Sequence, residues 1–182
     1  MTRRARRSAI RVVLVLVAAT AGFALLQSPT RHLEARATAW TLHLVAGGQP
    51  PVAAGPEIIV VPRHGYPFSA LVTPACSVLA SVLALVCLAA LAASARERSR
   101  SRELAALGAA VAIVSAGNVI RMAAVLWVGS VGGRGALVMF HDWVGAVFTF
   151  GYTLFGYILM LFLVLPRRTP PRRAPPAAEA IA

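Results

Sequence analysis

The sequence contains no lysine and few acidic residues, yet it is strongly basic. All 18 basic residues are arginine, six residues are acidic, and the formal net charge is +12. A nucleic-acid-binding protein needs such charge on a soluble face, together with groups that contact or stack on bases. Here the arginines cluster at the ends of apolar runs, the pattern that sets the orientation of membrane proteins. The composition therefore argues against nucleic acid as a partner.

Cysteine is also scarce. The two cysteines, Cys76 and Cys87, are eleven positions apart, which is about 16 Å along one helix. That separation is too long for a disulfide and argues against a membrane thiol oxidase, which needs two neighbouring thiols. Cys87 lies among leucines and valines and is interpreted as a packing residue. His32, His43 and His64 have no cysteine or carboxylate cluster around them, so neither a metal nor another cofactor is expected.

Apolar side chains are abundant instead. They make up 58% of the 182 residues, against 13% charged residues, a composition typical of a protein whose solvent is lipid. The sequence predicts an all-α integral membrane domain over residues 12–165, between a basic segment 1–11 and a disordered cytoplasmic tail 166–182. The four expected transmembrane helices are residues 12–28, 74–94, 104–128 and 142–165.

The positions of the arginines predict the orientation of these spans. Thirteen lie in the N-terminal segment, the loop between spans two and three, and the tail, whereas four lie in the other two connections. Since cytoplasmic flanks retain arginine, both termini are predicted on the cytoplasmic side of the cell membrane. A Gly-rich outer loop is predicted at residues 129–135. A signal peptide cleaved near Ala35–Ala37 is the alternative for span one, but that site lies far beyond the apolar run. An uncleaved anchor is therefore favoured.

Residues 30–73, between spans one and two, are predicted to lie outside the membrane. Residues 57–61 and 66–73 flank the turn-forming segment 62–65 and predict a short β-hairpin. Before them, five apolar residues recur at helical spacing and favour a helix lying in the membrane interface. These residues are Leu33, Ala37, Trp40, Leu44 and Val45.

One layer near the outer surface gathers the residues that can carry chemistry. Arg121 lies within the depth of a predicted span, where an ion is costly enough to indicate function. Helix geometry places it about 25 Å above the cytoplasmic side of a core about 30 Å thick. Cys76 reaches about 27 Å by the same count, and His141 begins span four on that side. Asn118 lies one turn below Arg121, and Asp142 follows His141.

The local sequence around the cysteine predicts an activated thiol. Thr73 is a favourable N-cap, and Pro74 is favourable at the first helical position. Cys76 is therefore expected in the first turn of span two. There, free N–H groups and the helix dipole would stabilise a thiolate.

This ordered set resembles the exosortases and archaeosortases, which are membrane cysteine transpeptidases, over spans two to four. The family's cysteine is commonly followed by Ser-Gly and matches Cys76-Ser77, with Val78 in place of the glycine. The family's arginine, three residues after an asparagine, matches Arg121. Its histidine at the start of the next span matches His141.

The resemblance implies a mechanism and a substrate class. Cys76 would attack a peptide carbonyl to form a thioester, and His141 would act first as general acid and then as general base. Arg121 would stabilise the oxyanion, with Asn118 orienting it or adding a donor. Asp142 would hold the histidine tautomer, although neighbouring helical residues point about 100° apart. The substrates would be surface proteins that end in a short motif, one span and a basic tail.

A non-catalytic membrane scaffold is the alternative function. In that case the glycines of the spans would only allow helices to pack closely. A transporter would need polar groups through more of the membrane's depth than this one layer.

Overall fold

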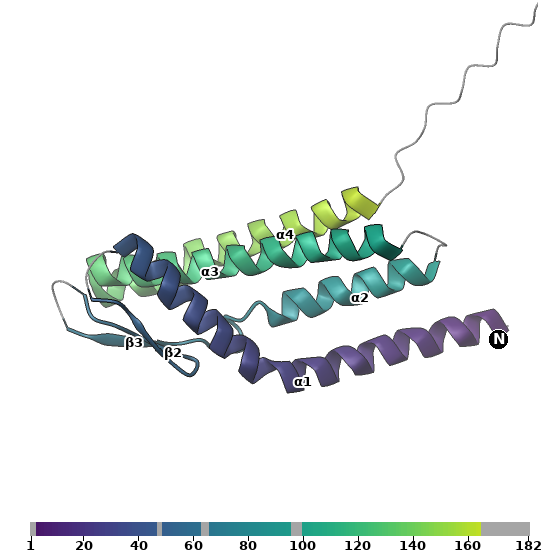
Figure 1. The fold of residues 1–182 in the computed structure, drawn as a ribbon, viewed down its shortest axis with the longest axis horizontal. Coiled ribbons are helices and arrows are strands. Elements are labelled where there is room, and N and C mark those ends of the chain that lie inside the picture. The colour runs from purple at the N-terminus through teal and green to yellow at the C-terminus, as the bar shows by residue number, and fades with distance from the viewer. Residues whose placement is uncertain (1–2, 47–48, 63–65, 96–99, 165–182) are drawn as a thin grey trace, which may run out of the picture.

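The computed structural model describes residues 3–46, 49–62, 66–95 and 100–164. Helices α2, α3 and α4 run side by side, and a small sheet and the second half of α1 lie at one end of them (Figure 1). The predicted tail 166–182 lies outside the described residues. The elements in chain order are α1 (Arg3–Ala46), β1 (Val52–Ala54), β2 (Glu57–Val60), β3 (Phe68–Leu71), α2 (Leu79–Ala95), α3 (Arg100–Met139), the π-helical turn η1 (Phe140–Val144) and α4 (Gly145–Val164).

Helix α1 joins two predicted elements, span one and the interfacial helix. Pro29 lies inside it, and the helix bends near its middle (Figure 1). Proline removes one backbone hydrogen bond and so bends a helix without always ending it. The prediction of two separate helices is therefore wrong. The first half exposes apolar side chains such as Leu14 and Leu25, whereas the second half buries Ala35 and Leu42 against the sheet and α3.

The apolar stripe predicted on the second half of α1 lies on its exposed side. Leu33, Trp40 and Leu44 are each more than 60% exposed. The opposite side of the same helix is buried. The stripe is thus accessible to lipid, and its position in the membrane interface stays a prediction.

The expected hairpin is part of a three-stranded antiparallel sheet with the order β1-β2-β3. Strands β2 and β3 are the predicted pair, and residues 63–65 of the predicted turn lie outside the described residues. Strand β1 was not predicted, since three residues give too little pattern. Gly55, with φ +64°, makes the turn between β1 and β2. The sheet buries Ile58 and Val60 against α1 and α3.

Cys76 does not lie in the first turn of a helix, because α2 begins only at Leu79. The N–H of Cys76 donates to the carbonyl of Thr73 at 3.0 Å, which closes a separate turn before the helix. Ser77, and not Thr73, caps α2, since its Oγ accepts the N–H of Leu79 at 3.3 Å. The predicted N-cap is therefore wrong, and the helix dipole does not explain the thiol's setting.

The Gly-rich segment 129–135 is not an extended loop. Helix α3 continues through it with one break at Gly133, whose φ of +75° suits glycine. The chain then reverses, and α4 runs back beside α3 (Figure 1). The two helices approach closely at Gly156, where an added Cβ would lie 2.5 Å from Val114 Cγ2. Glycine thus sets the α3–α4 packing.

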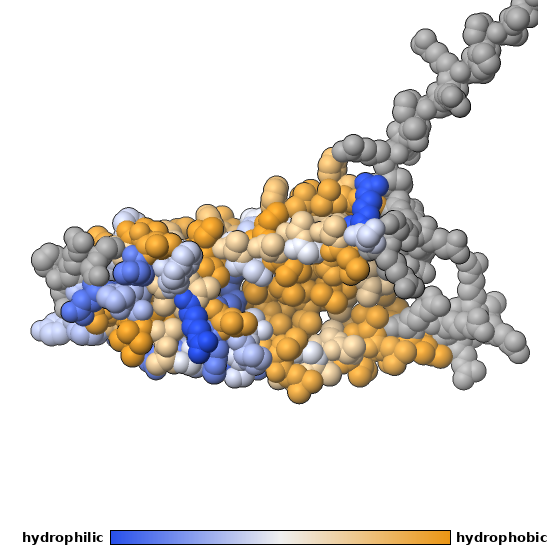
Figure 2. Space-filling view, in the orientation of Figure 1, coloured by the Kyte–Doolittle hydropathy of each residue, from blue (hydrophilic) through white to orange (hydrophobic). Residues whose placement is uncertain are grey.

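Two stretches of the described chain are long and apolar enough to cross a membrane, Val12–Ala46 and Ser101–Val164. The second stretch folds back on itself as α3 and α4, and the apolar part Leu79–Leu91 of α2 is shorter. Figure 2 shows hydrophobic residues over the helical bundle and hydrophilic residues gathered at the end with the sheet. This surface is that of a mostly helical membrane protein with a more polar cap, formed by the sheet and the second half of α1.

Candidate active site

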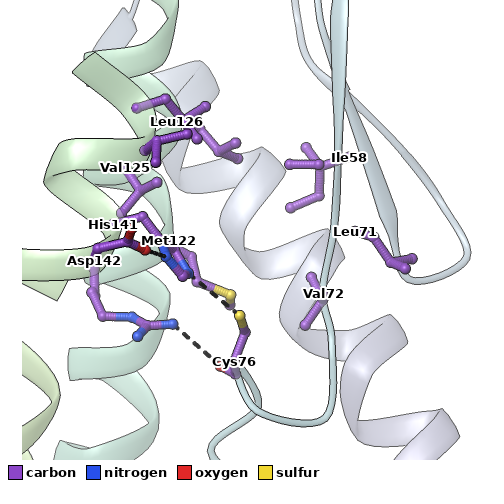
Figure 3. Close-up of a pocket in the computed structure, with 13 residues that line it drawn as sticks. Ile58, Leu71, Val72, Cys76, Met122, Val125, Leu126, His141 and Asp142 are labelled. Atoms are coloured by element: carbon purple, nitrogen blue, oxygen red, sulfur yellow. Dashed lines mark hydrogen bonds and ion pairs between the residues drawn. The ribbon is translucent and has the colours of Figure 1, made fainter. Parts of the chain in front are cut away.

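A thiol and an imidazole from distant parts of the chain lie side by side where the sheet meets the bundle. The Sγ of Cys76 is 3.6 Å from the Nε2 of His141 (Figure 3). Cys76 lies in the turn before α2 and His141 in η1, so both lie outside the apolar helices. Thr73 donates its hydroxyl to the same sulfur at 3.2 Å. This contact geometry brings a nucleophile within reach of a base.

The surroundings stabilise the charged forms of both groups. Burial alone would raise the pKa of the Cys76 thiol, but the Thr73 hydroxyl, His141 and the Arg121 charge together bring that pKa below its usual value. Asp142 and then Cys76 raise the pKa of His141, against partial burial and the Arg121 charge. A thiolate beside an imidazolium is the state that these shifts favour.

Arg121 lies on α3 beside the cysteine turn and is 8% exposed. Its Nη1 donates to the hydroxyl of Thr149 on α4 at 2.9 Å, and its Nη2 lies 3.5 Å from the Cys76 carbonyl. Its buried Nε has no partner among the described residues. The guanidinium is therefore fixed by two elements and retains a donor for a further acceptor.

Asn118 holds the cysteine turn. Its Nδ2 donates to the Cys76 carbonyl at 3.0 Å and to Glu34 Oε1 at 2.7 Å, while its Oδ1 accepts the hydroxyl of Tyr152 at 3.0 Å. Both amide hydrogens have partners, so Asn118 positions the main chain of Cys76 and contributes no spare donor. It makes no hydrogen bond to Arg121 in the described structure.

Glu34 is a site residue that the sequence did not reveal. Its carboxylate is 5% exposed, and Oε1 accepts the N–H of Val78 at 2.8 Å as well as Asn118. It thus binds the chain on the helix side of Cys76, at the position where the family commonly has glycine. The available signal was that Glu34 is the one acidic residue in α1.

An apolar cavity of about 260 Å³ opens beside the sulfur. Cys76, Arg121 and His141 line it together with apolar residues of α3 and of the strand that leads to the cysteine. Figure 3 shows the side chains of Cys76, His141 and several of the apolar residues, such as Met122 and Val72, around a common space. The apolar lining residues are Ile58, Ala70, Leu71, Val72, Met122, Val125, Leu126, Leu137 and Val138.

Asp142 and Ser77, which were predicted as supporting residues, differ in whether they contact the pair of Cys76 and His141. Asp142 Oδ1 lies 3.1 Å from the Nδ1 of His141, despite their adjacent positions. The wider π-helical turn of η1 brings them together, which a regular α-helix would not favour. Ser77 points to the start of α2 and not to the sulfur. The structure therefore groups Asp142, and not Ser77, with the reactive pair.

Together, the apolar bundle and the cysteine, histidine and arginine at its capped end define a helical membrane protein with a thiol-based site. A family model described as transmembrane exosortase (Exosortase_EpsH) matches residues 2–164. The chain therefore belongs to the exosortase family, as its residues predicted, and this is a family of cysteine transpeptidases. No curated protein and no solved structure matches the chain.

Proposed function

We propose that this protein is a cysteine transpeptidase that cleaves the C-terminal sorting regions of surface proteins and transfers the proteins to an acceptor. The observation that carries the proposal is the 3.6 Å contact between Cys76 Sγ and His141 Nε2, at the edge of a cavity that Arg121 also lines. A packing cysteine needs neither an imidazole nor a guanidinium beside it. This cluster favours the enzyme over the non-catalytic scaffold.

In the proposed reaction the Cys76 thiolate attacks the carbonyl carbon of a substrate peptide bond. The bond to nitrogen breaks, His141 gives its proton to the leaving amine, and a thioester remains on the sulfur. An acceptor nucleophile then loses its proton to His141 and attacks the thioester, which releases the thiolate. Arg121 stabilises the oxyanion of each tetrahedral intermediate, with large effect because it is nearly buried.

The membrane arrangement is part of the same proposal. Four crossings, by the first half of α1 and by α2, α3 and α4, would place both termini in the cytoplasm. The cap with the sheet and the site would then face outward from the cytoplasmic membrane. A substrate anchored by one span with a basic cytoplasmic tail could reach the site laterally at that face.

The two cysteines provide the test. In host cells carrying Cys76→Ala, mass spectrometry of all surface proteins that end in a short motif, a span and a basic tail should find the tail uncleaved. Cys87→Ala is the matched control, because that thiol lies in the bundle, and it should leave cleavage intact. If every such protein is still processed with Cys76→Ala, the enzyme proposal is wrong and the scaffold is favoured.

The orientation has an independent test. In intact cells an impermeant thiol reagent should label Cys76 in the Cys87→Ala variant. Labelling only after the membrane is opened would contradict the outward site.

A further inference from the structure

The strand that leads into the cysteine turn has a free edge. β3 is the last strand of the sheet, with β2 on one side and no strand on the other within the described residues. The chain reaches Thr73 two residues after the end of β3 at Leu71, and Cys76 three residues later, with no helix between. Any peptide paired with this edge would therefore run next to the sulfur.

The register identifies which main-chain groups are free. The N–H of Val72 donates to the carbonyl of Pro56 at 2.9 Å, and Ala70 pairs with Ile58 in the same ladder. Because main-chain groups alternate in direction along a strand, those of Ser69 and Leu71 point away from β2. Each of these two residues thus presents an N–H and a carbonyl at the edge.

The edge is fixed in place next to the site. Pro56 has no N–H to give to the Val72 carbonyl, and the Nε of Arg31 on α1 donates to that carbonyl instead. This bond ties the last ladder position of β3 to the helix that also carries Glu34. A strand held at this end offers a pre-organised template for an added peptide.

Two cavities border this edge and share part of their lining. The cavity beside Cys76 is lined by residues 70–72, and a larger one, of about 950 Å³, by residues 66–69. Both are lined by Leu137 and Val138. The side chain of Leu71 points away from the site (Figure 3).

We propose that the substrate binds as an added strand on the free edge of β3, with its scissile bond delivered to Cys76. This rests on the proposed function and deepens it by naming the bound form of the peptide. Main-chain groups of Ser69 and Leu71 would pair with the peptide, as in other cases of strand addition. Alternate side chains of the peptide would enter the cavity beside Cys76, whose wall of aliphatic residues and Met122 selects apolar ones.

A proline on β3 can remove a main-chain donor from the free edge and leave the hydrogen bonds between β3 and β2 in place. Leu71→Pro removes an N–H that faces the free edge, and edge strands tolerate proline there. It should reduce processing of the proteins that depend on Cys76 by about tenfold or more, the effect of a lost main-chain bond and a hindered approach. Leu71→Ala keeps the N–H and is the matched control, so it should process them about tenfold or more faster than Leu71→Pro.

The rate of Cys76 alkylation by iodoacetamide, measured on the full chain in the Cys87→Ala background, shows whether the site itself is intact. Leu71→Pro should match Leu71→Ala in this rate while it loses processing. Equal processing by the two variants would overturn the added strand. If Cys76→Ala also has no effect on processing, the proposed function is wrong as well. If processing depends on Cys76 but Leu71→Pro does not reduce it, only the proposal of an added strand is wrong.

Photo-cross-linking tests the same contact without turnover. In the Cys76→Ala variant, a benzophenone amino acid in place of Ser69 should cross-link an uncleaved sorting-region protein. The same residue in place of Val52, on the opposite edge of the sheet in β1, should not. Cross-linking from position 52 alone would contradict the assignment to β3, even if the proline variant failed to fold.

Discussion

The molecule has two apolar cores that differ in kind, and the cysteine turn connects them. One core joins the second half of α1, the sheet and the part of α3 around Met122, and Val72 is its last member before the cysteine. The other joins α2, α3 and α4 and begins at Val78. Cys76 lies between these two valines. The site thus lies at the junction of the two cores. One core holds the chain before Cys76, and the other holds the chain after it.

The two cores also differ in their polar content. The bundle packs apolar side chains and closely approaching glycines, as helices in lipid do. The cap core instead contains buried polar side chains, Glu34 and Thr38, on the same face of α1 as its alanines. The cap therefore resembles the interior of a soluble protein, and it supplies the carboxylate that fixes the cysteine turn. Variants on the two sides should have different consequences.

Arg121, where the two cores meet, should give the largest effect. Arg121→Ala removes the proposed oxyanion donor and should reduce processing about 10²–10³-fold. Arg121→Lys should restore little of it, since one ammonium cannot contact both Thr149 and the Cys76 carbonyl as the planar group does. Tail cleavage measured by mass spectrometry checks this. Arg102→Ala, at the far end of α3, is the control, and an equal loss there would point to folding instead.

On the cap side, Glu34 should give an intermediate effect. Glu34→Ala leaves the Val78 N–H and an Asn118 hydrogen without their buried acceptor and should reduce processing about tenfold or more. Glu34→Gln keeps an acceptor oxygen at that place and should retain most of the activity. The alkylation rate of Cys76 should fall in the same order. Wild-type behaviour of Glu34→Ala would show that the cap does not position the nucleophile.

On the bundle side, glycine substitution should change stability more than chemistry. In Gly156→Ala the new Cβ meets Val114 at 2.5 Å, and such overpacking costs about 1–3 kcal/mol. Gly151→Ala has no atom within 4 Å of its Cβ and is the matched control. Thermal unfolding in detergent should show a lower Tm for Gly156→Ala alone. Equal Tm values would mean that α3 and α4 can separate freely at this point.

The sequence predicted an apolar helical bundle, because the length of the apolar runs constrains helices in lipid strongly. The orientation derived from the arginines stays a prediction. Counting residues along the expected spans put Cys76, Arg121 and His141 in one layer, and the structure brings these three together. The predicted ends of the helices were less accurate. One glycine, Gly133, breaks α3 where a seven-residue loop was expected.

The cap was harder to predict, since its contacts join residues far apart in the chain. Glu34 is 84 positions from Asn118 and 44 from Val78. It reaches them because α1 bends near its middle (Figure 1) and packs its second half on the sheet, and no local pattern encodes the direction of that bend. The apolar stripe of the same helix, with Trp40, is visible in the sequence, but it lies on the exposed side of the helix and not on the buried side that carries Glu34.

The most direct test of the central claim is the pH dependence of Cys76 alkylation by iodoacetamide, in the Cys87→Ala variant. The thiolate is the reacting form, so the rate rises as pH passes upward through the thiol pKa. Because Thr73, His141 and Arg121 bring that pKa below its usual value, the midpoint should lie below that of free cysteine measured under the same conditions. His141→Ala removes one of these contributions, burial still acts, and the midpoint should shift upward. A midpoint at or above the free-cysteine value, unchanged in His141→Ala, would contradict a shared site of thiol and imidazole.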